Sequence, residues 1–262
     1  LLLLILQGRL MQHLSSMVLG NTIPYIKKGM LENFEFKLPP LQEQKRIIAK
    51  LDKIFSSIDD LKSSCFIKIS QLEKNQNHFV ENLINESSSL CKKIRLGDAC
   101  HGVQYGSSKK SSISGKYPVI RMGNIQNGSL ELSDLVFTND DVEAEKYKLK
   151  KGDVLFNRTN SSVHVGKTAM FNESGHYVFA GYLIRINYIK DKVCPQFLSL
   201  YLNSIKIRNY GFSVMSESVN QSNINGTKLK NYPFYEISME EQKRLSKVIS
   251  NFNNATNGLI KI

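Results

Sequence analysis

The sequence predicts an α+β protein in which a globular domain of mixed short strands and helices is joined to long coiled-coil helices. Three observations lead to this fold class. A long segment without glycine or proline carries apolar residues at heptad spacing. A segment rich in short apolar runs and turn residues follows it. The first residues of the long segment then return near the end of the chain, where a second helical pattern starts.

The long segment runs from Leu41 to about Ser87 and is predicted to be one continuous helix. Its apolar residues alternate in steps of three and four, which is the spacing of a coiled-coil seam. A helix of this length cannot fold back on itself, so its apolar stripe needs a partner in this chain or in another one. The seam residues that we expect to carry helix pairing are Leu51, Phe55, Ile58, Ile69 and Leu72.

The motif Glu43-Gln44-Lys45-Arg46 in the first turn of this helix returns unchanged as Glu241-Gln242-Lys243-Arg244, offset by 198 residues. Other identities at that offset lie on both sides of the motif, including Ile26 with Ile224, Phe36 with Phe234 and Leu61 with Leu259. The repeat predicts a duplicated unit of domain plus helix, with both helices starting alike. Because the chain begins inside a predicted helix, we expect it to be a fragment of a longer protein.

The formal net charge is +12, from 35 basic and 23 acidic residues. This excess favours a polyanionic partner or a membrane surface. The apolar run Leu1–Leu6 is too short to cross a bilayer, so no membrane span is expected. The cysteines Cys65, Cys91, Cys100 and Cys194 form no close pair, which fits a reduced, cytoplasmic protein without structural zinc. Cys65 falls on the helix seam and is expected to be a core thiol.

Residues 1–38 resemble the end of a globular domain, with a helix from Leu1 to about Met17 and strands at Thr22–Ile26 and Phe34–Leu38. Residues 92–236 are predicted to form a second domain, with one helix at Pro195–Tyr210 whose inner face includes Ile205. The acidic stretch Asn139–Glu145 is interpreted as a solvated loop. The expected strands of this domain are Val119–Met122, Asp153–Phe156, Thr168–Phe171, Tyr177–Ala180 and Leu183–Ile186.

No catalytic motif emerges from the sequence. Val165-Gly166-Lys167-Thr168 resembles the end of a phosphate-binding loop, but position 161 is serine where that loop requires glycine. The Asn-Pro-Pro-Tyr or Asp-Pro-Pro-Tyr tetrapeptide of base-modifying methyltransferases is absent, as is a glycine-rich cofactor turn. The histidines show no metal-ligand spacing with cysteines or carboxylates. We therefore expect neither a metal ion nor a cofactor.

Three polar loops in the second domain combine amide, hydroxyl and basic side chains: residues 104–112, 157–162 and 220–223. Such side chains contact bases and phosphates in DNA interfaces. Arg158 and Gln104 are the candidates for reading bases, while the lysines are expected to contact phosphates. The candidate DNA-binding residues are Gln104, Tyr105, Ser107, Lys109, Lys110, Arg121, Asn124, Asn157, Arg158, Asn160, Ser161 and Lys167.

Taken in order, several motifs resemble the DNA-specificity subunit of type I restriction–modification systems. They include Pro40-Leu41-Gln42-Glu43-Gln44 at the helix start, the run from Tyr117 to Ile125, the run from Leu149 to Ser161, Val165-Gly166-Lys167, and Asn220-Gln221-Ser222-Asn223-Ile224. The resemblance covers essentially the whole chain. It implies a non-catalytic subunit with two target-recognition domains, each of which reads one half of a split site in double-stranded DNA.

The resemblance also implies an organisation and a set of partners. The chain would comprise the tail of a first target-recognition domain (1–38), a long spacer helix (39–88), a complete second recognition domain (89–236) and the start of a second spacer helix (237–262). The spacer helices would lie antiparallel and dock methylation subunits, and the complex would recruit the restriction subunit. A second copy of the chain would supply the helix length missing at the end.

Two alternatives from other classes remain open at this point. One is a nuclease or methyltransferase whose catalytic residues escape recognition in the sequence. The other is an interaction scaffold in which the coiled coil is the function and the basic charge is incidental. Metal-dependent cleavage or cofactor binding would favour the first alternative, and absence of salt-dependent DNA binding would favour the second.

Overall fold

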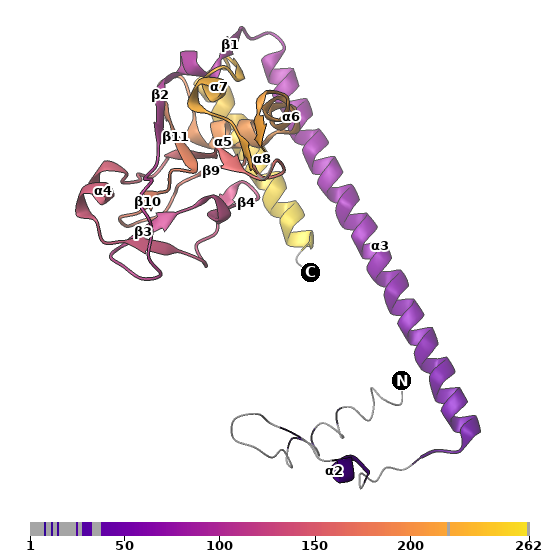
Figure 1. The fold of residues 1–262 in the computed structure, drawn as a ribbon. Helices are drawn as coiled ribbons and strands as arrows, with labels where there is room; N and C mark the ends of the chain where they lie inside the picture. Colours follow the sequence, from indigo (N-terminus) through magenta and orange to yellow (C-terminus); the bar gives the residue numbers. More distant parts are fainter. Residues whose placement is uncertain are drawn as a thin grey trace. The chain divides into compact units, whose positions relative to one another are not determined.

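The fold was obtained as a computed structural model, which describes residues 38–218 and 221–260, together with Gly8, Gln12, Ser15, Tyr25 and Lys28–Glu32 (Figure 1). By their internal contacts the residues divide into two compact units, Leu1–Ile69 and Ser70–Ile262. Most of the helix and the strands expected within residues 1–38 lies outside the described residues. Only the short helix α2 (Lys28–Glu32) is assigned there.

The predicted long helix is present as α3 (Leu41–Ser88), with 48 residues. In the first unit its apolar stripe is not fully covered, because Phe55 and Ile58 are 46% and 39% exposed. Cys65 is also exposed. The expectation of a core thiol at this seam position was therefore wrong for this chain, since a seam residue becomes buried only where a partner packs on it.

The second unit is built around a four-stranded antiparallel sheet in the order β2-β11-β7-β9. Its strands are β2 (Cys100–Tyr105), β11 (Leu183–Tyr188), β7 (Val154–Asn157) and β9 (Thr168–Met170). Each of the five predicted strands coincides with an observed strand of this unit, and no end differs by more than two residues. The mixed helix-and-strand class is thus confirmed.

Smaller sheets surround the central one. A three-stranded sheet has the order β10-β3-β6, and another has the order β12-β13-β8. Two-stranded sheets pair β1 with β14 and β4 with β5. The strands are β1 (Lys93–Arg95), β3 (Tyr117–Ile120), β4 (Ile125–Gln126), β5 (Ser129–Leu130), β6 (Val136–Thr138), β8 (Thr159–Asn160), β10 (Val178–Phe179), β12 (Ser216–Ser218), β13 (Gln221–Asn223) and β14 (Pro233–Tyr235), with 3-10 helices η1 (Leu96–Ala99) and η2 (Met122–Asn124).

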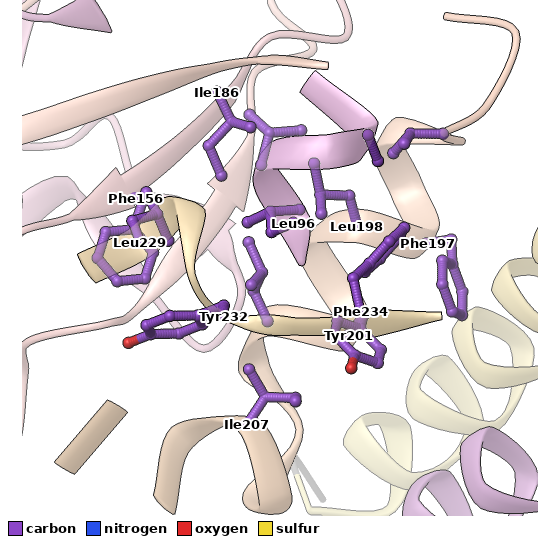
Figure 2. Close-up of a cluster of buried hydrophobic side chains, with 14 of the residues drawn as sticks. Leu96, Phe156, Ile186, Phe197, Leu198, Tyr201, Ile207, Leu229, Tyr232 and Phe234 are labelled. Carbon is purple, nitrogen blue, oxygen red and sulfur yellow. The ribbon is translucent and has the colours of Figure 1, made fainter. Parts of the chain in front are cut away.

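The main core of the second unit lies between the central sheet and helix α5 (Pro195–Asn203), with short helix α7 (Gly226–Lys230) closing it (Figure 2). Tyr201 and Phe234 pack edge to face with ring centroids 5.1 Å apart. The Tyr201 hydroxyl donates to the carbonyl of Pro233 at 2.9 Å, and burial raises the pKa of this phenol. This pairing of a satisfied hydroxyl with aromatic packing ties α5 to β14.

The predicted helix Pro195–Tyr210 is two helices, α5 and α6 (Ile205–Val214), separated by Ser204 in an extended conformation. The Asn203 side chain accepts from the backbone N–H of Thr168 at 3.1 Å and donates to the Thr168 carbonyl at 2.7 Å. These bonds anchor the end of α5 to β9. As a result Ile205, expected on the inner face, is 44% exposed, and Ile207 is buried in its place.

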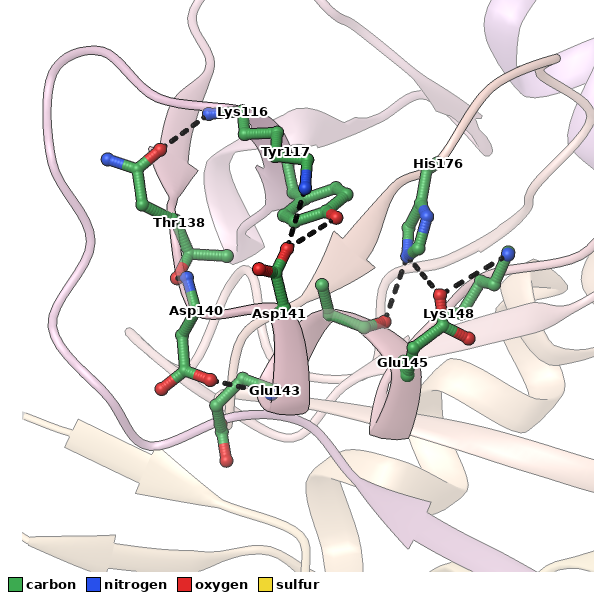
Figure 3. Close-up of polar contacts among 11 residues, drawn as sticks. Lys116, Tyr117, Thr138, Asp140, Asp141, Glu143, Glu145, Lys148 and His176 are labelled. Carbon is green, nitrogen blue, oxygen red and sulfur yellow. Dashed lines mark hydrogen bonds and ion pairs between the residues drawn. The ribbon is translucent and has the colours of Figure 1, made fainter.

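The acidic stretch expected to be a solvated loop contains helix α4 (Asp141–Lys146). The Asp140 carboxylate caps it by accepting from the backbone N–H of Glu143 at 3.0 Å. Lys116 and Tyr117 both bind the Asp141 carboxylate, at 2.8 and 2.7 Å (Figure 3). The carboxylates of this stretch therefore cap and anchor a helix, rather than being simply solvated.

Within the second unit, helix α8 (Met239–Ile260) runs antiparallel to the end of α3. The rings of Phe79 and Phe252 have centroids 4.4 Å apart, and the Gln76 amide donates to Asn253 at 2.7 Å. Nearer the start of α8, the Ser87 hydroxyl donates to Glu241 at 2.6 Å. Among the helices that the structure describes, none has the length and apolar character needed to span a membrane.

Candidate nucleic-acid interface

The three predicted loops meet at Arg158. The backbone N–H of Ile224 donates to the Arg158 carbonyl at 2.9 Å, and the Asn223 amide donates to the Thr159 hydroxyl at 2.6 Å. The second loop thus contains strand β8 and the third loop contains strand β13, and the two strands pair in one sheet. From the first loop, Tyr105 accepts from the backbone N–H of Gly226 at 2.7 Å through its hydroxyl.

The Arg158 guanidinium lies over the Tyr105 ring, 4.8 Å from the ring centroid. Its Nη1 donates to the carbonyl of Gly181 at 3.3 Å, while its buried Nε has no hydrogen-bond partner. Tyr105 and Tyr182 are 40% and 48% exposed beside it. A guanidinium carries five N–H donors, and among the described residues no carboxylate pairs with Arg158. The Arg158 guanidinium therefore keeps N–H donors that can bind an acceptor on another molecule.

Gln104 is held inside the domain. Its Oε1 accepts a short hydrogen bond from Arg185, and its Nε2 donates to the carbonyl of Lys146 at 3.3 Å. Arg185 in turn pairs with Asp153 at 2.8 Å. With both ends of the amide engaged, Gln104 is a weaker candidate for reading bases than Arg158.

Ser107 and Lys109 lie against the acidic helix α4. The Ser107 hydroxyl donates a short hydrogen bond to Glu143, and the Lys109 ammonium pairs with Asp140 at 2.6 Å. This pairing raises the pKa of Lys109 and lowers that of Asp140. Lys109 therefore has a local counter-charge, whereas the neighbouring Lys110 is exposed and is not paired within the described residues.

Three other predicted residues, Arg121, Asn160 and Lys167, line one surface cavity with a volume of about 360 Å³. We call it the Lys167 cavity. Its polar lining consists of Arg121, Gln126, Asp134, Asn160, His164 and Lys167. The Lys167 ammonium donates to the Gln126 side chain at 3.2 Å, and Arg121 pairs with Asp134 at 2.9 Å. Ser161 is exposed next to Asn160.

Asn124 and Asn157 are buried, at 4% and 0% exposure, so they are removed from the set of DNA-contacting candidates. Asn124 accepts from the backbone N–H of Arg121 at 2.8 Å and donates to the carbonyls of Glu131 and Asp134. This orders one wall of the Lys167 cavity. The sequence pattern placed both asparagines next to strands but did not reveal that their amides point inward.

Asn157 orders a second part of the wall of the Lys167 cavity, the turn that carries His164 and Lys167. Its side chain donates to the carbonyl of His164 at 3.2 Å, and its backbone pairs with Gly166 and Lys167 at 2.8 Å. Gly166 has φ +88°, and a Cβ there would lie 2.7 Å from Arg208. Glycine is therefore required because this turn is left-handed and approached by a guanidinium, not because it binds a nucleotide.

Sequence reasoning missed Gln126, His164 and Tyr182. Gln126 is brought to the cavity by the β4–β5 hairpin, a long-range placement that no local pattern encodes. Tyr182, in contrast, left a readable signal, because it follows glycine directly before a strong apolar strand pattern. Within the part of the chain that the structure describes, no group of three His, Cys, Asp or Glu side chains could hold a metal ion.

Comparison with known proteins identifies the family. A sequence model of the type I restriction modification DNA specificity domain matches residues 1–71 and 89–261. The chain belongs to this family. Both matched segments include the start of a helix with the Glu-Gln-Lys-Arg motif, so the family match agrees with the internal repeat.

Relatives in this family are specificity subunits. The chain is 26% identical over 249 residues to the type I restriction enzyme EcoKI specificity subunit of Escherichia coli strain K12, covering 88% of this chain and 53% of the relative. It is 33% identical over 143 residues to a sequence described as the type I restriction enzyme MjaX specificity subunit of Methanocaldococcus jannaschii, covering 53% of this chain and 33% of the relative. The chain thus spans a third to about half of these relatives.

Solved structures support the specificity-subunit fold. A chain in a structure described as the basis of complex assembly and conformational transition of the type I R-M system has a TM-score of 0.65 at 17% identity, covering 92% of this chain and 59% of that chain. The HsdS subunit from Thermoanaerobacter tengcongensis has a TM-score of 0.53 at 18% identity, and the match covers 96% of this chain and 61% of that subunit. These likenesses support the α+β domain with its long helix.

Proposed function

We propose that this chain is a sequence-specific DNA-recognition component of a type I restriction–modification system. Its role would be to direct methylation and cleavage to a target site, without contributing catalytic residues of its own. The observation that carries the proposal is the convergence of three polar loops on Arg158 in a domain of the specificity family. The formal net charge of +12 is consistent with a polyanionic partner.

Arg158 is the proposed base-reading residue. A guanidinium presents a rigid fork that matches the O6 and N7 acceptors of guanine in the major groove. Stacking on Tyr105 would fix the plane of that fork before DNA binds, because the arginine gives up less conformational freedom when it is already positioned. Lys110 and Ser161, both exposed, are proposed phosphate contacts.

The partners follow from the same proposal. Methylation subunits and a restriction subunit would assemble with the chain in a reduced cytoplasmic compartment, where its cysteines are free thiols. We also propose that α3 pairs with another long helix through Leu51, Phe55, Ile58, Ile69 and Leu72, and that a second copy of this chain is one source of it. Sedimentation of the wild-type chain and of Phe55→Lys would test this. A concentration-dependent dimer that Phe55→Lys abolishes supports the pairing, and a wild-type monomer at all concentrations contradicts it.

The proposed function is tested by binding the chain, alone and with a type I methylation subunit, to a random-sequence duplex pool over a salt series. We expect enrichment of a short motif and an affinity that falls steeply as salt rises, because base readout is added to phosphate contacts. Salt-sensitive binding without any motif would leave only a basic scaffold. Metal-dependent cleavage of the pool would instead point to an enzyme.

Arg158→Lys is the sharpest variant for this experiment, because it keeps the charge and removes the fork. We expect it to lose about 1–3 kcal/mol of discrimination at one base pair while the salt dependence stays unchanged. Arg158→Ala should lose the same discrimination and also some salt dependence. If Arg158→Lys selects the wild-type motif with wild-type preference at every position, Arg158 does not read a base.

A further inference from the structure

We propose that the Lys167 cavity binds one backbone phosphate of the DNA, with the Lys167 ammonium as its counter-charge. This inference rests on the proposed function and assigns a chemistry to one part of the surface. It distinguishes the cavity from the Arg158 region, where bases would be read.

Charge balance is the first step. Arg121 in the cavity is neutralised by Asp134, 2.9 Å away. Lys167 has no carboxylate within ion-pair distance among the described residues, and its hydrogen-bond acceptor, Gln126, is neutral. The cavity therefore carries one uncompensated positive charge, which matches the single negative charge of a phosphodiester.

The environment of Lys167 makes this charge costly in the free protein. Burial lowers the pKa of its ammonium, and the positive charge of Arg208 lowers it further. Among the described residues Arg208 has no carboxylate partner: its guanidinium donates to the carbonyl of Val163 at 2.8 Å, makes a short hydrogen bond to the carbonyl of Val165 and lies over the Phe212 ring. An anion beside Lys167 would offset both the burial of the ammonium and its repulsion by Arg208, whereas a neutral ligand would offset neither effect.

Hydrogen-bond donors for such an anion are present. Asn160 Oδ1 accepts from the backbone N–H of Ser161 at 2.8 Å, and its Nδ2 donor has no partner among the described residues. His164 is exposed at the rim of the cavity and adds a ring nitrogen. Amide and imidazole N–H groups together with an ammonium form a donor set suited to phosphate oxygens.

The walls are held from behind by the two buried asparagines. Asn124 ties together the segment that carries Arg121 and Asp134, and Asn157 ties together the turn that carries His164 and Lys167. Because each wall is fixed by internal hydrogen bonds, the cavity is largely formed before DNA arrives. A preformed site loses less entropy on binding, which favours a fixed register of the duplex on the domain.

The test compares Lys167→Met with wild type on the selected duplex and on a scrambled duplex. Loss of one phosphate contact should reduce the salt exponent by about 0.9, so both duplexes should bind roughly eightfold more weakly at 0.1 M salt than in wild type, and almost equally at 1 M. The selected motif should not change. The matched control is Lys151→Met, an exposed lysine before β7, at the opposite end of that strand from Arg158, and it should leave the exponent unchanged.

A second arm uses the wild-type chain and a series of duplexes in which one phosphate at a time is replaced by a neutral methylphosphonate. At one position, replacement of the phosphate should weaken wild-type binding by the factor expected for Lys167→Met. The same replacement should not weaken the binding of Lys167→Met any further. This double-mutant coupling identifies the phosphate without relying on a single variant. Thermal unfolding of Lys167→Met should occur at or above the wild-type temperature, because a costly charge has been removed.

The outcomes separate this inference from the proposed function. If wild type binds without a motif or without salt dependence, the proposed function itself fails. If wild type is selective but Lys167→Met keeps the full salt exponent and no methylphosphonate couples to it, the phosphate site alone is wrong. A changed motif for Lys167→Met would make Lys167 a base-reading residue. Lys167-dependent binding of inorganic phosphate without coupling to DNA would indicate a free-anion site and would also overturn the inference.

Discussion

The starts of α3 and α8 have the same motif and the same local structure, but different surroundings. Gln44 donates to the carbonyl of Pro39 at 2.8 Å, and Gln242 donates to the carbonyl of Ile237 at 2.8 Å, five residues earlier in both helices. In each helix the glutamate of the motif pairs with the arginine three residues later at 2.6 Å. Short-range sequence therefore determines how each helix begins.

The two helix starts differ in what packs on them. Gln242 is fully buried, and beyond its local bond it accepts from the backbone N–H of Cys194 at 2.9 Å and donates to the carbonyl of Lys192 at 2.8 Å. Leu245 is fully buried in the same core, whereas its counterpart Ile47 is only half-buried. In the second unit the motif at the start of α8 is therefore both a helix start and a docking element for the domain before it.

The largest expected difference is between Leu245→Ala and Ile47→Ala. Leu245→Ala should destabilise the second unit by about 3–4 kcal/mol, because it leaves a cavity in the main core, and should lower its melting temperature by roughly 6–12 °C. Ile47→Ala should cost less than about 1 kcal/mol. Circular dichroism melts, with hydrogen exchange of α5 and α8 amides, measure both effects. Equal losses would break the comparison by showing that the start of α3 is buried in solution.

The next difference is between Gln242→Ala and Gln44→Ala. Gln242→Ala removes three hydrogen bonds to backbone groups, at Lys192, Cys194 and Ile237. We expect a loss of about 2–3 kcal/mol, since buried backbone groups would lose their partners, against about 0.5 kcal/mol for Gln44→Ala. The amides of Cys194 and its neighbours in α5 should exchange faster only in Gln242→Ala. Unchanged exchange there would mean that the local cap, rather than docking, is what Gln242 contributes.

Much of the fold could be predicted because its signals are local. The heptad spacing predicted α3, and short apolar runs predicted β7, β9 and β11. Helix α4 was missed although its signal was present, because Asp140 followed by Glu143 is the pattern of a helix N-cap with an acidic third residue. The break at Ser204 could not be predicted, because Asn203 bonds to Thr168, 35 residues earlier.

In the candidate interface, too, the loops could be predicted from local sequence, whereas the orientation of individual side chains could not. Polar residues after strands predicted three loops, which the structure brings together at Arg158, and Asn160 of the second loop also lines the Lys167 cavity. Whether an individual side chain faces solvent depends on packing between distant segments. Asn124 and Asn157 therefore look like DNA contacts in sequence and are internal in the structure, while Gln126 and His164 become cavity residues.

The smallest expected difference concerns Glu241 and Glu43. Arg244 and the Ser87 hydroxyl lower the pKa of Glu241 from 4.5 to about 2, whereas the pKa of Glu43 is lowered by its hydrogen bond to Arg46 and by the charges of Arg46 and Lys50. A lowered carboxyl pKa contributes stability that is fully present above the unfolded pKa and is lost as pH falls through the folded pKa. Glu241→Gln should therefore be less stable than wild type by roughly 1 kcal/mol at pH 6, after allowance for solvent screening. This gap should close between about pH 4.5 and pH 2. Glu43→Gln should show a smaller gap at every pH, and a gap as large as that of Glu241→Gln would mean that the contact with Ser87 contributes nothing to docking α8 on α3.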